Sequence, residues 1–81
     1  MKKITIYTTT YCPWCQATKD FLKQNNYEFE EKNVENNPEW ANEMVEKSGQ
    51  YGVPVIDIEG KIIVGYSPEE IMEAIKGEDN N

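Results

Sequence analysis

The sequence predicts an α/β fold of the order βαβ-α-ββα, in which a four-stranded mixed sheet is flanked by helices. The first half of the chain has the length and the pattern of a βαβ unit. It begins with a β-branched strand at residues 3–8, continues with a helix whose apolar residues recur at three- and four-residue spacing, and ends with a strand at residues 27–34. The strands of such a unit are parallel. The dipeptide Glu59-Gly60 then separates apolar runs at 53–58 and 61–64, which is typical of an antiparallel hairpin.

Proline marks the beginning of each predicted helix. Pro13, Pro38 and Pro68 each stand where a helical pattern begins, and a proline at the first helical position loses no hydrogen bond. Trp14, Ala17, Thr18, Phe21 and Leu22 form the apolar face of the first helix. The three helices therefore follow the first strand, the second strand and the hairpin.

The length of 81 residues allows one domain with a compact core. We assign residues 1–77 to that domain and the polar residues 78–81 to a disordered tail. No apolar run is long enough to span a bilayer, and no secretion signal follows the first residues. We therefore expect a cytoplasmic protein, and we expect it to be a monomer.

The charge of the chain restricts its partners. The formal net charge is −7, so the phosphates of nucleic acid and an anionic membrane surface would repel the protein. We expect neither nucleic acid nor membrane as a partner, and we interpret most of the acidic residues as a solvated surface that favours solubility.

The two cysteines of the chain, Cys12 and Cys15, lie at the predicted start of the first helix. With Pro13 at the first helical position, Cys12 lies near the N-cap, where free N–H groups and the helix dipole favour a thiolate. Cys15 follows almost one turn later, within disulfide reach. This pattern predicts a redox pair in which Cys12 attacks a substrate disulfide and the shielded Cys15 then displaces the mixed disulfide.

The neighbours of the cysteines tune this site. We assign that role to Tyr11, Pro13 and Trp14, which are next to the cysteines in the chain, because Pro13 stiffens the turn and removes one N–H. Trp14 has two interpretations, which stay open: it presents an apolar surface to a partner, or it packs on the helix face.

Other uses of the two thiols are less favoured. Zinc takes four ligands, and two cysteines without any histidine supply them only in a dimer that shares two motifs. A structural disulfide across so short a loop stabilises little and is unusual in a reducing cytosol. We therefore expect no bound metal or cofactor, and we keep a metal-bridged dimer or binding module as the minor alternative.

The dipeptide Val53-Pro54 begins an apolar strand, where proline is confined to the first residues or to an edge. Val53 must then be extended, and the bond between the two residues is either trans, the commoner state, or cis, as in tight turns. A cysteine pair on a βαβ unit adds weight to cis, and both states stay open at this point.

Several segments together resemble the glutaredoxin family over residues 3–76, and most closely its NrdH-redoxin class: Ile4-Thr5-Ile6-Tyr7-Thr8, Cys12-Pro13-Trp14-Cys15, Gln16-Ala17-Thr18-Lys19, Val53-Pro54 and Gly65-Tyr66-Ser67-Pro68. The resemblance implies a thioredoxin-like fold, a Cys12 nucleophile, a Cys15 resolving thiol and a cis bond before Pro54. It also implies that Val53 presents its backbone to a bound peptide as to an added strand, and that the protein is a dithiol–disulfide oxidoreductase.

The positions at which the chain departs from the family pattern indicate which electron donor to expect. Glutaredoxins that use glutathione usually carry a basic residue before the cysteines, where this chain has Thr8-Thr9-Thr10-Tyr11. They also carry a Gly-Gly pair followed by an acidic pair, where this chain has Gly65-Tyr66-Ser67-Pro68-Glu69. An aromatic after that glycine and a nearby proline resemble NrdH-redoxins, although the Pro-Trp pair between the cysteines is nearer to glutaredoxins.

NrdH-redoxins are reduced by thioredoxin reductase, and they supply electrons to ribonucleotide reductase. The resemblance therefore implies reducing equivalents from thioredoxin reductase and NADPH, and ribonucleotide reductase or other protein disulfides as substrates. Glutathione as donor is the alternative. We assign substrate binding to Val53, Pro54, Gly65, Tyr66 and Ser67.

Overall fold

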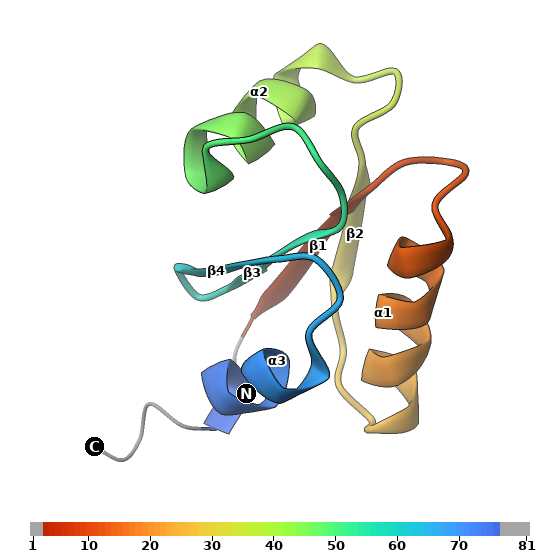
Figure 1. The fold of residues 1–81 in the computed structure, drawn as a ribbon, viewed down its shortest axis with the longest axis vertical. Helices are drawn as coiled ribbons and strands as arrows, with labels where there is room; N and C mark the ends of the chain where they lie inside the picture. The colour runs from red at the N-terminus through yellow and green to blue at the C-terminus, as the bar shows by residue number, and fades with distance from the viewer. Residues whose placement is uncertain (1–2, 77–81) are drawn as a thin grey trace.

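The computed structural model of the chain describes residues 3–76. Its elements are β1 (Ile4–Thr8), α1 (Pro13–Gln24), β2 (Glu30–Asn33), α2 (Pro38–Ser48), β3 (Val55–Ile58), β4 (Lys61–Val64) and α3 (Pro68–Lys76). The four strands form one sheet in the order β2-β1-β3-β4 (Figure 1). The predicted order is confirmed, whereas the proposed end of the domain at residue 77 and the proposed tail lie outside the described residues.

Strand β1 is the centre of the sheet. It runs parallel to β2 and antiparallel to β3, and β3 runs antiparallel to β4. All five of its residues are buried, because helices cover both faces of the sheet: α1 and α3 lie on one side and α2 on the other (Figure 1). Across residues 3–76, no helix combines the length and the apolar composition that a bilayer span requires.

The two faces of the sheet carry separate cores, since successive side chains of a strand point to opposite faces. Ile6 packs with Leu22 of α1 and Ile71 of α3 in the larger core. Tyr7 packs with Met44 of α2 in the smaller one. Alternate positions of the central strand therefore belong to different cores, Ile4 and Ile6 to the larger and Tyr7 to the smaller.

Strand β2 is shorter than the predicted strand at residues 27–34. Only Glu30–Asn33 pairs with β1, in the register from Thr5↔Glu30 to Thr8↔Asn33. Tyr27 and Phe29 precede the paired segment and pack, half-buried, against the larger core. Their alternation with acidic residues reflects this packing and not strand pairing, so the predicted start of the strand was wrong.

A polar network joins α2 to the sheet beneath it. The buried Tyr7 hydroxyl donates to the Glu43 carboxylate and accepts from Lys47 Nζ at 3.1 Å. Lys47 also donates to Asp57 on β3 at 2.6 Å, and Lys32 on β2 donates to Glu43 at 3.0 Å. Hydrogen bonds from Tyr7 and then Lys32 hold the pKa of Glu43 below its ordinary value. The network therefore ties one helix to three strands.

The Asp57 carboxylate of this network makes stability depend on pH. Burial raises its pKa, but hydrogen bonds from Lys47 and from the Gly60 N–H outweigh burial and set the pKa below its ordinary value of 3.8. A carboxyl whose pKa is lowered by folding stabilises the fold above its unfolded pKa, and this contribution is lost as the pH falls through the folded pKa. We therefore expect Asp57→Asn to flatten the fall in the free energy of unfolding below about pH 4.

Urea unfolding of the two proteins across the acidic range measures this effect. The matched control is the same Asp57→Asn substitution in a Lys47→Met background, where the cation that lowers the pKa of Asp57 is already absent. Asp57→Asn should flatten the curve much less there. An equal change in both backgrounds would show that the pairing with Lys47 is not the cause.

Candidate active site

The strand register brings the predicted site residues to one end of the sheet. Tyr7 pairs with Val55 across an antiparallel ladder, so the chain that leaves β1 toward the cysteines lies beside the chain that enters β3. On the other side of β3, the Gly65 N–H donates to the Pro54 carbonyl at 2.8 Å. The cysteine loop, the Val53-Pro54 segment and the Gly65 turn therefore meet at this end.

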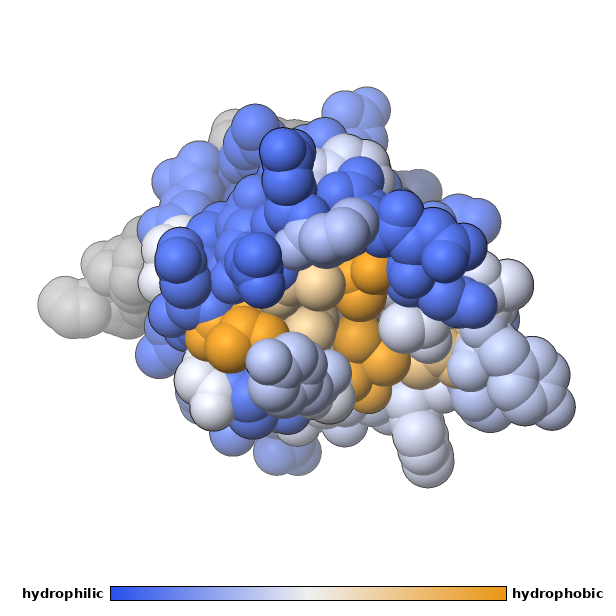
Figure 2. Space-filling model, turned by 90° about the horizontal axis from the view of Figure 1, so that it is seen from above, coloured by the Kyte–Doolittle hydropathy of each residue, from blue (hydrophilic) through white to orange (hydrophobic). Residues whose placement is uncertain are grey.

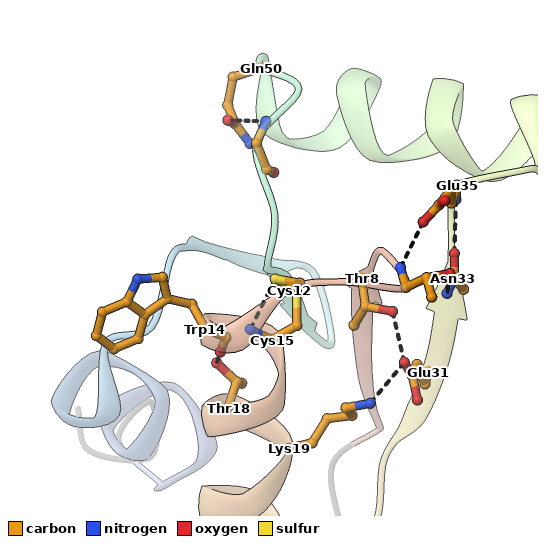
Figure 3. Close-up of a disulfide and its surroundings, with 12 residues drawn as sticks. Thr8, Cys12, Trp14, Cys15, Thr18, Lys19, Glu31, Asn33, Glu35 and Gln50 are labelled. Carbon is orange, nitrogen blue, oxygen red and sulfur yellow. Dashed lines mark hydrogen bonds and ion pairs between the residues drawn. A yellow bond between two sulfur atoms is a disulfide. The ribbon is translucent and has the colours of Figure 1, made fainter.

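Cys12 and Cys15 form a disulfide at the start of α1, with their Cα atoms 5.2 Å apart (Figure 3). Cys12 is the N-cap residue, and its Sγ accepts a hydrogen bond from the Cys15 N–H at 3.1 Å. Pro13 occupies the first turn, as predicted. Cys15 is 1% exposed, whereas Cys12 is partly exposed. The two residues therefore differ in exposure, and the Cys15 N–H lies where it would stabilise a thiolate at Cys12.

Trp14 is not part of the core. Its side chain is 62% exposed and stacks on Tyr66 with ring centroids 5.7 Å apart. Tyr66 in turn contacts Phe21 edge to face at 6.4 Å. The prediction that Trp14 belongs to the apolar face of the helix was therefore wrong, because the buried residues of α1 begin at Cys15 and continue with Thr18. The indole instead links the cysteine turn to the segment after β4.

Two exposed tyrosines flank the same end of the molecule. Tyr11, next to Cys12 in the chain, is 90% exposed, and Tyr51, two residues before Val53, is 79% exposed. Figure 2 views this end from above and shows an apolar strip between hydrophilic side chains. Tyr11 was predicted to belong to the site, whereas Tyr51 was not, although its aromatic side chain so close to Val53-Pro54 in the sequence could have indicated it.

The loop between β1 and Cys12 is tied to the end of β2. The Thr10 N–H donates to Glu35 Oε1 at 2.8 Å, and Asn33 Nδ2 donates to Thr10 Oγ1 at 3.3 Å. The Glu35 N–H donates to the Asn33 side chain at 2.9 Å and completes a closed set of contacts (Figure 3). These bonds fix the approach to the first cysteine.

A second polar contact fixes the end of β1 beneath this loop. The buried Thr8 hydroxyl donates to Glu31 at 2.7 Å, and Lys19 of α1 donates to the same carboxylate oxygen at 3.1 Å (Figure 3). Burial raises the pKa of Glu31, but these two hydrogen bonds outweigh burial and the pKa is lowered. Glu31 therefore stays a carboxylate that joins β1, β2 and α1.

The Val53–Pro54 peptide bond is cis, as predicted. Pro54 is fully buried, and β3 begins only at Val55, so the predicted strand start at residue 53 was wrong by two residues. Within residues 3–76, neither the N–H nor the carbonyl of Val53 has a hydrogen-bond partner, while Pro54 uses its carbonyl for Gly65. A free backbone pair therefore lies next to the end of β3, beside the cysteine loop.

The turn after β4 brings Tyr66 to the site. Gly65 has a φ of +89°, a conformation that favours glycine, and it redirects the chain toward α3. The Ser67 carbonyl accepts from the Ile71 N–H at 2.9 Å, which places Ser67 at the start of that helix. Contact of Tyr66 with Trp14 joins this turn to the cysteine turn, whereas a part for Gly65 and Ser67 in substrate binding stays a prediction.

The part of the chain that the structure describes contains no group of three or more His, Cys, Asp or Glu side chains arranged to hold a metal ion. The two sulfurs are instead bonded to each other. The arrangement suits the exchange of a disulfide between this pair and another molecule, since the sulfur that a partner can reach is also the one at the helix N-terminus.

Comparison with known proteins agrees with this chemistry. The model of the glutaredoxin family matches residues 4–63. Over 73 residues the chain is 47% identical to an uncharacterized glutaredoxin-like 8.6 kDa protein in the rubredoxin operon of Clostridium pasteurianum, covering 90% of this chain and 97% of the relative.

Two solved structures show the same fold. The glutaredoxin grx-1 of Archaeoglobus fulgidus superposes with a TM-score of 0.86 at 30% identity, over 95% of this chain and 89% of that one. The glutaredoxin-like NrdH-redoxin of Escherichia coli superposes with a TM-score of 0.77 at 34% identity, over 88% of this chain and 92% of that one. With its thioredoxin-like fold and its Cys12–Cys15 pair, the chain belongs to the glutaredoxin family, whose members are thiol-disulfide oxidoreductases.

Proposed function

We propose that this protein is a cytoplasmic dithiol electron carrier that reduces protein disulfides and is itself reduced by thioredoxin reductase. The observation that carries the proposal is the unequal exposure of the two cysteines: Cys12 is partly exposed at the N-cap of α1, and Cys15 is buried. One thiol can therefore meet a substrate while the other is reserved for the second step.

The proposed reaction begins with the reduced protein. The Cys12 thiolate attacks one sulfur of the substrate disulfide, forms a mixed disulfide and releases the other substrate sulfur as a thiolate, which takes up a proton. The Cys15 thiolate then attacks Cys12 Sγ, and the second substrate sulfur leaves in the same way. Two electrons pass to the substrate, and the product is the Cys12–Cys15 disulfide that the structure contains.

A peptide segment fits the surroundings of the disulfide. The free N–H and carbonyl of Val53 can pair with the backbone of an extended chain, as in the addition of a strand to a sheet edge. Tyr11, Trp14 and Tyr51 are all exposed around this end, and aromatic residues are enriched where proteins meet. We therefore propose protein disulfides, ribonucleotide reductase among them, as substrates.

The aromatic contacts near the disulfide favour thioredoxin reductase over glutathione as donor. Tyr66 is covered on one side by Trp14 and on another by Phe21, so rings occupy the surface where the resemblance assigns a glycine pair to glutathione-using relatives. Glutathione is also anionic, and the net charge of the chain is −7. A thioredoxin-like activity profile is named for the E. coli NrdH-redoxin, which shares this fold.

An assay with two donors tests the proposal. The oxidised protein is incubated with NADPH and thioredoxin reductase, or with NADPH, glutathione and glutathione reductase, and NADPH oxidation is followed with insulin as the disulfide substrate. We expect turnover with thioredoxin reductase at least about tenfold faster than with glutathione, because glutathione lacks a complementary site. A Cys12→Ser/Cys15→Ser double variant is the blank, and fast turnover with glutathione alone would contradict the choice of donor.

A further inference from the structure

We infer that Gln50 is a positioning residue for the substrate-binding segment: its side-chain amide holds Gly52 and so fixes the free backbone of Val53 beside the disulfide. This inference rests on the proposed reduction of protein disulfides, and it adds to that proposal a residue that distinguishes peptide substrates from small disulfides.

The Gln50 side chain binds both backbone groups of Gly52. Gln50 Oε1 accepts from the Gly52 N–H at 2.6 Å, and Gln50 Nε2 donates to the Gly52 carbonyl at 3.0 Å. A single amide thus gives Gly52 the donor and acceptor that a paired strand would give it. We call this pair of hydrogen bonds the Gln50 clasp.

The Gln50 clasp is anchored to the end of α2. Gln50 Nε2 and the Gln50 N–H lie 3.3 and 3.4 Å from Ser48 Oγ, and the Ser48 hydroxyl donates to the Met44 carbonyl at 2.7 Å. Met44 is itself 1% exposed in the smaller core. The position of Gly52 is therefore fixed through Gln50 and Ser48 to a buried part of the fold.

The absence of a side chain at Gly52 is what allows this approach. A Cβ placed on Gly52 would lie 2.8 Å from Gln50 Oε1, closer than nonbonded atoms approach. Because that oxygen is at the end of a flexible side chain, it would move away, and the clasp would open at little cost to the rest of the fold. Gln50 and Gly52 are thus two halves of one contact.

With both backbone groups of Gly52 occupied, the neighbouring Val53 keeps a free N–H and a free carbonyl among the described residues, as Tyr51 does on the other side of Gly52. Without the Gln50 clasp, residue 52 is no longer held to the end of α2, and a peptide that binds Val53 must first order the segment. A small disulfide has no peptide backbone to pair with Val53, so its reaction does not depend on whether this segment is ordered.

Single-turnover kinetics of the reduced protein test this inference with two probes, insulin and 5,5′-dithiobis(2-nitrobenzoate). We expect Gln50→Ala and Gly52→Ala each to lower the rate constant with insulin about fivefold and the rate constant with the aromatic disulfide less than about twofold. The double variant should lose no more than either single variant, because both remove the same contact. Gln24→Ala, at the exposed end of α1, is the matched control and should leave both rate constants unchanged.

Amide hydrogen exchange gives a readout that does not depend on catalysis. The Gly52 N–H should exchange faster in Gln50→Ala, and it should remain protected in Gln50→Glu, which keeps the accepting oxygen but loses the donor to the Gly52 carbonyl. Equal ratios of the insulin and aromatic-disulfide rate constants in wild type and Gln50→Ala, or additive losses in the double variant, would overturn the inference. Wild-type protein that reduces neither probe would instead overturn the proposed function, and the exchange of Gly52 would still report whether Gln50 holds it.

Discussion

Cys12→Ser is expected to lower the rate of disulfide reduction by about a thousandfold or more, because a serine hydroxyl is neither ionised nor nucleophilic enough to replace a thiolate. Cys12 is the partly exposed sulfur at the N-cap, and Cys15 at 1% exposure cannot take its place without local opening of the helix. Stopped-flow reduction of insulin by the reduced variant measures the loss.

Cys15→Ser provides the complementary result. The variant should still attack a substrate, but without the resolving thiol it should accumulate the mixed disulfide on Cys12, visible as a mass increase equal to the substrate fragment. Dithiothreitol should remove the added mass. The assignment of roles would be reversed if Cys15→Ser lost all reaction with substrate while Cys12→Ser formed the stable adduct.

Leu22→Ala is expected to destabilise the protein by about 3 kcal/mol, because it leaves a cavity where α1 meets the sheet. Leu22 is fully buried and shares the larger core with Ile6, Ile56 and Ile71, which come from two strands and α3. For a domain of this size the loss corresponds to a fall in Tm of about 12–24 °C. Thermal unfolding followed by circular dichroism measures it.

A second aliphatic truncation separates burial from side-chain size. Val64 is 48% exposed on β4, so Val64→Ala should change stability by less than about 0.5 kcal/mol. Similar losses in the two variants would mean that Leu22 does not occupy a rigid part of the core. The Leu22→Ala protein should also keep the reactivity of Cys12 below its lowered Tm, since α1 still begins at Pro13.

The sequence was sufficient to predict the order of strands and helices, for identifiable physical reasons. Proline at the start of each helix and glycine in the Glu59-Gly60 turn are local signals that tertiary contacts do not override. The cis bond before Pro54 was also predicted, but from the cysteine pair on a βαβ unit and from the resemblance to the glutaredoxin family, since a proline that begins a strand is more often trans.

Alternation and periodicity were less reliable guides to pairing and burial. Tyr27 and Phe29 alternate with acids as in a strand, yet they pack on the core before β2 begins. Trp14 fits the apolar spacing of α1, yet it is exposed and stacks on Tyr66. A one-dimensional pattern does not show where the paired strand ends or where the neighbouring layer stops.

The hydrogen bonds that hold the loops of the site in place could not be predicted from the sequence. The Gln50 clasp depends on the path of the chain after α2, and the contacts of Thr10 with Asn33 and Glu35 depend on the end of β2 lying beside the end of β1. Polar residues in loops have many possible partners, and only the folded chain selects among them.

The position of β1 between β2 and β3 has a consequence for synthesis on the ribosome. Cys12 and Cys15 emerge early, directly after β1, whereas β3 and the Val53-Pro54 segment beside them emerge only after α2. One side of β1 therefore has no partner strand until the second half of the chain has been made. During that interval the nascent chain carries both thiols without the Val53-Pro54 segment that lies beside them in the folded protein.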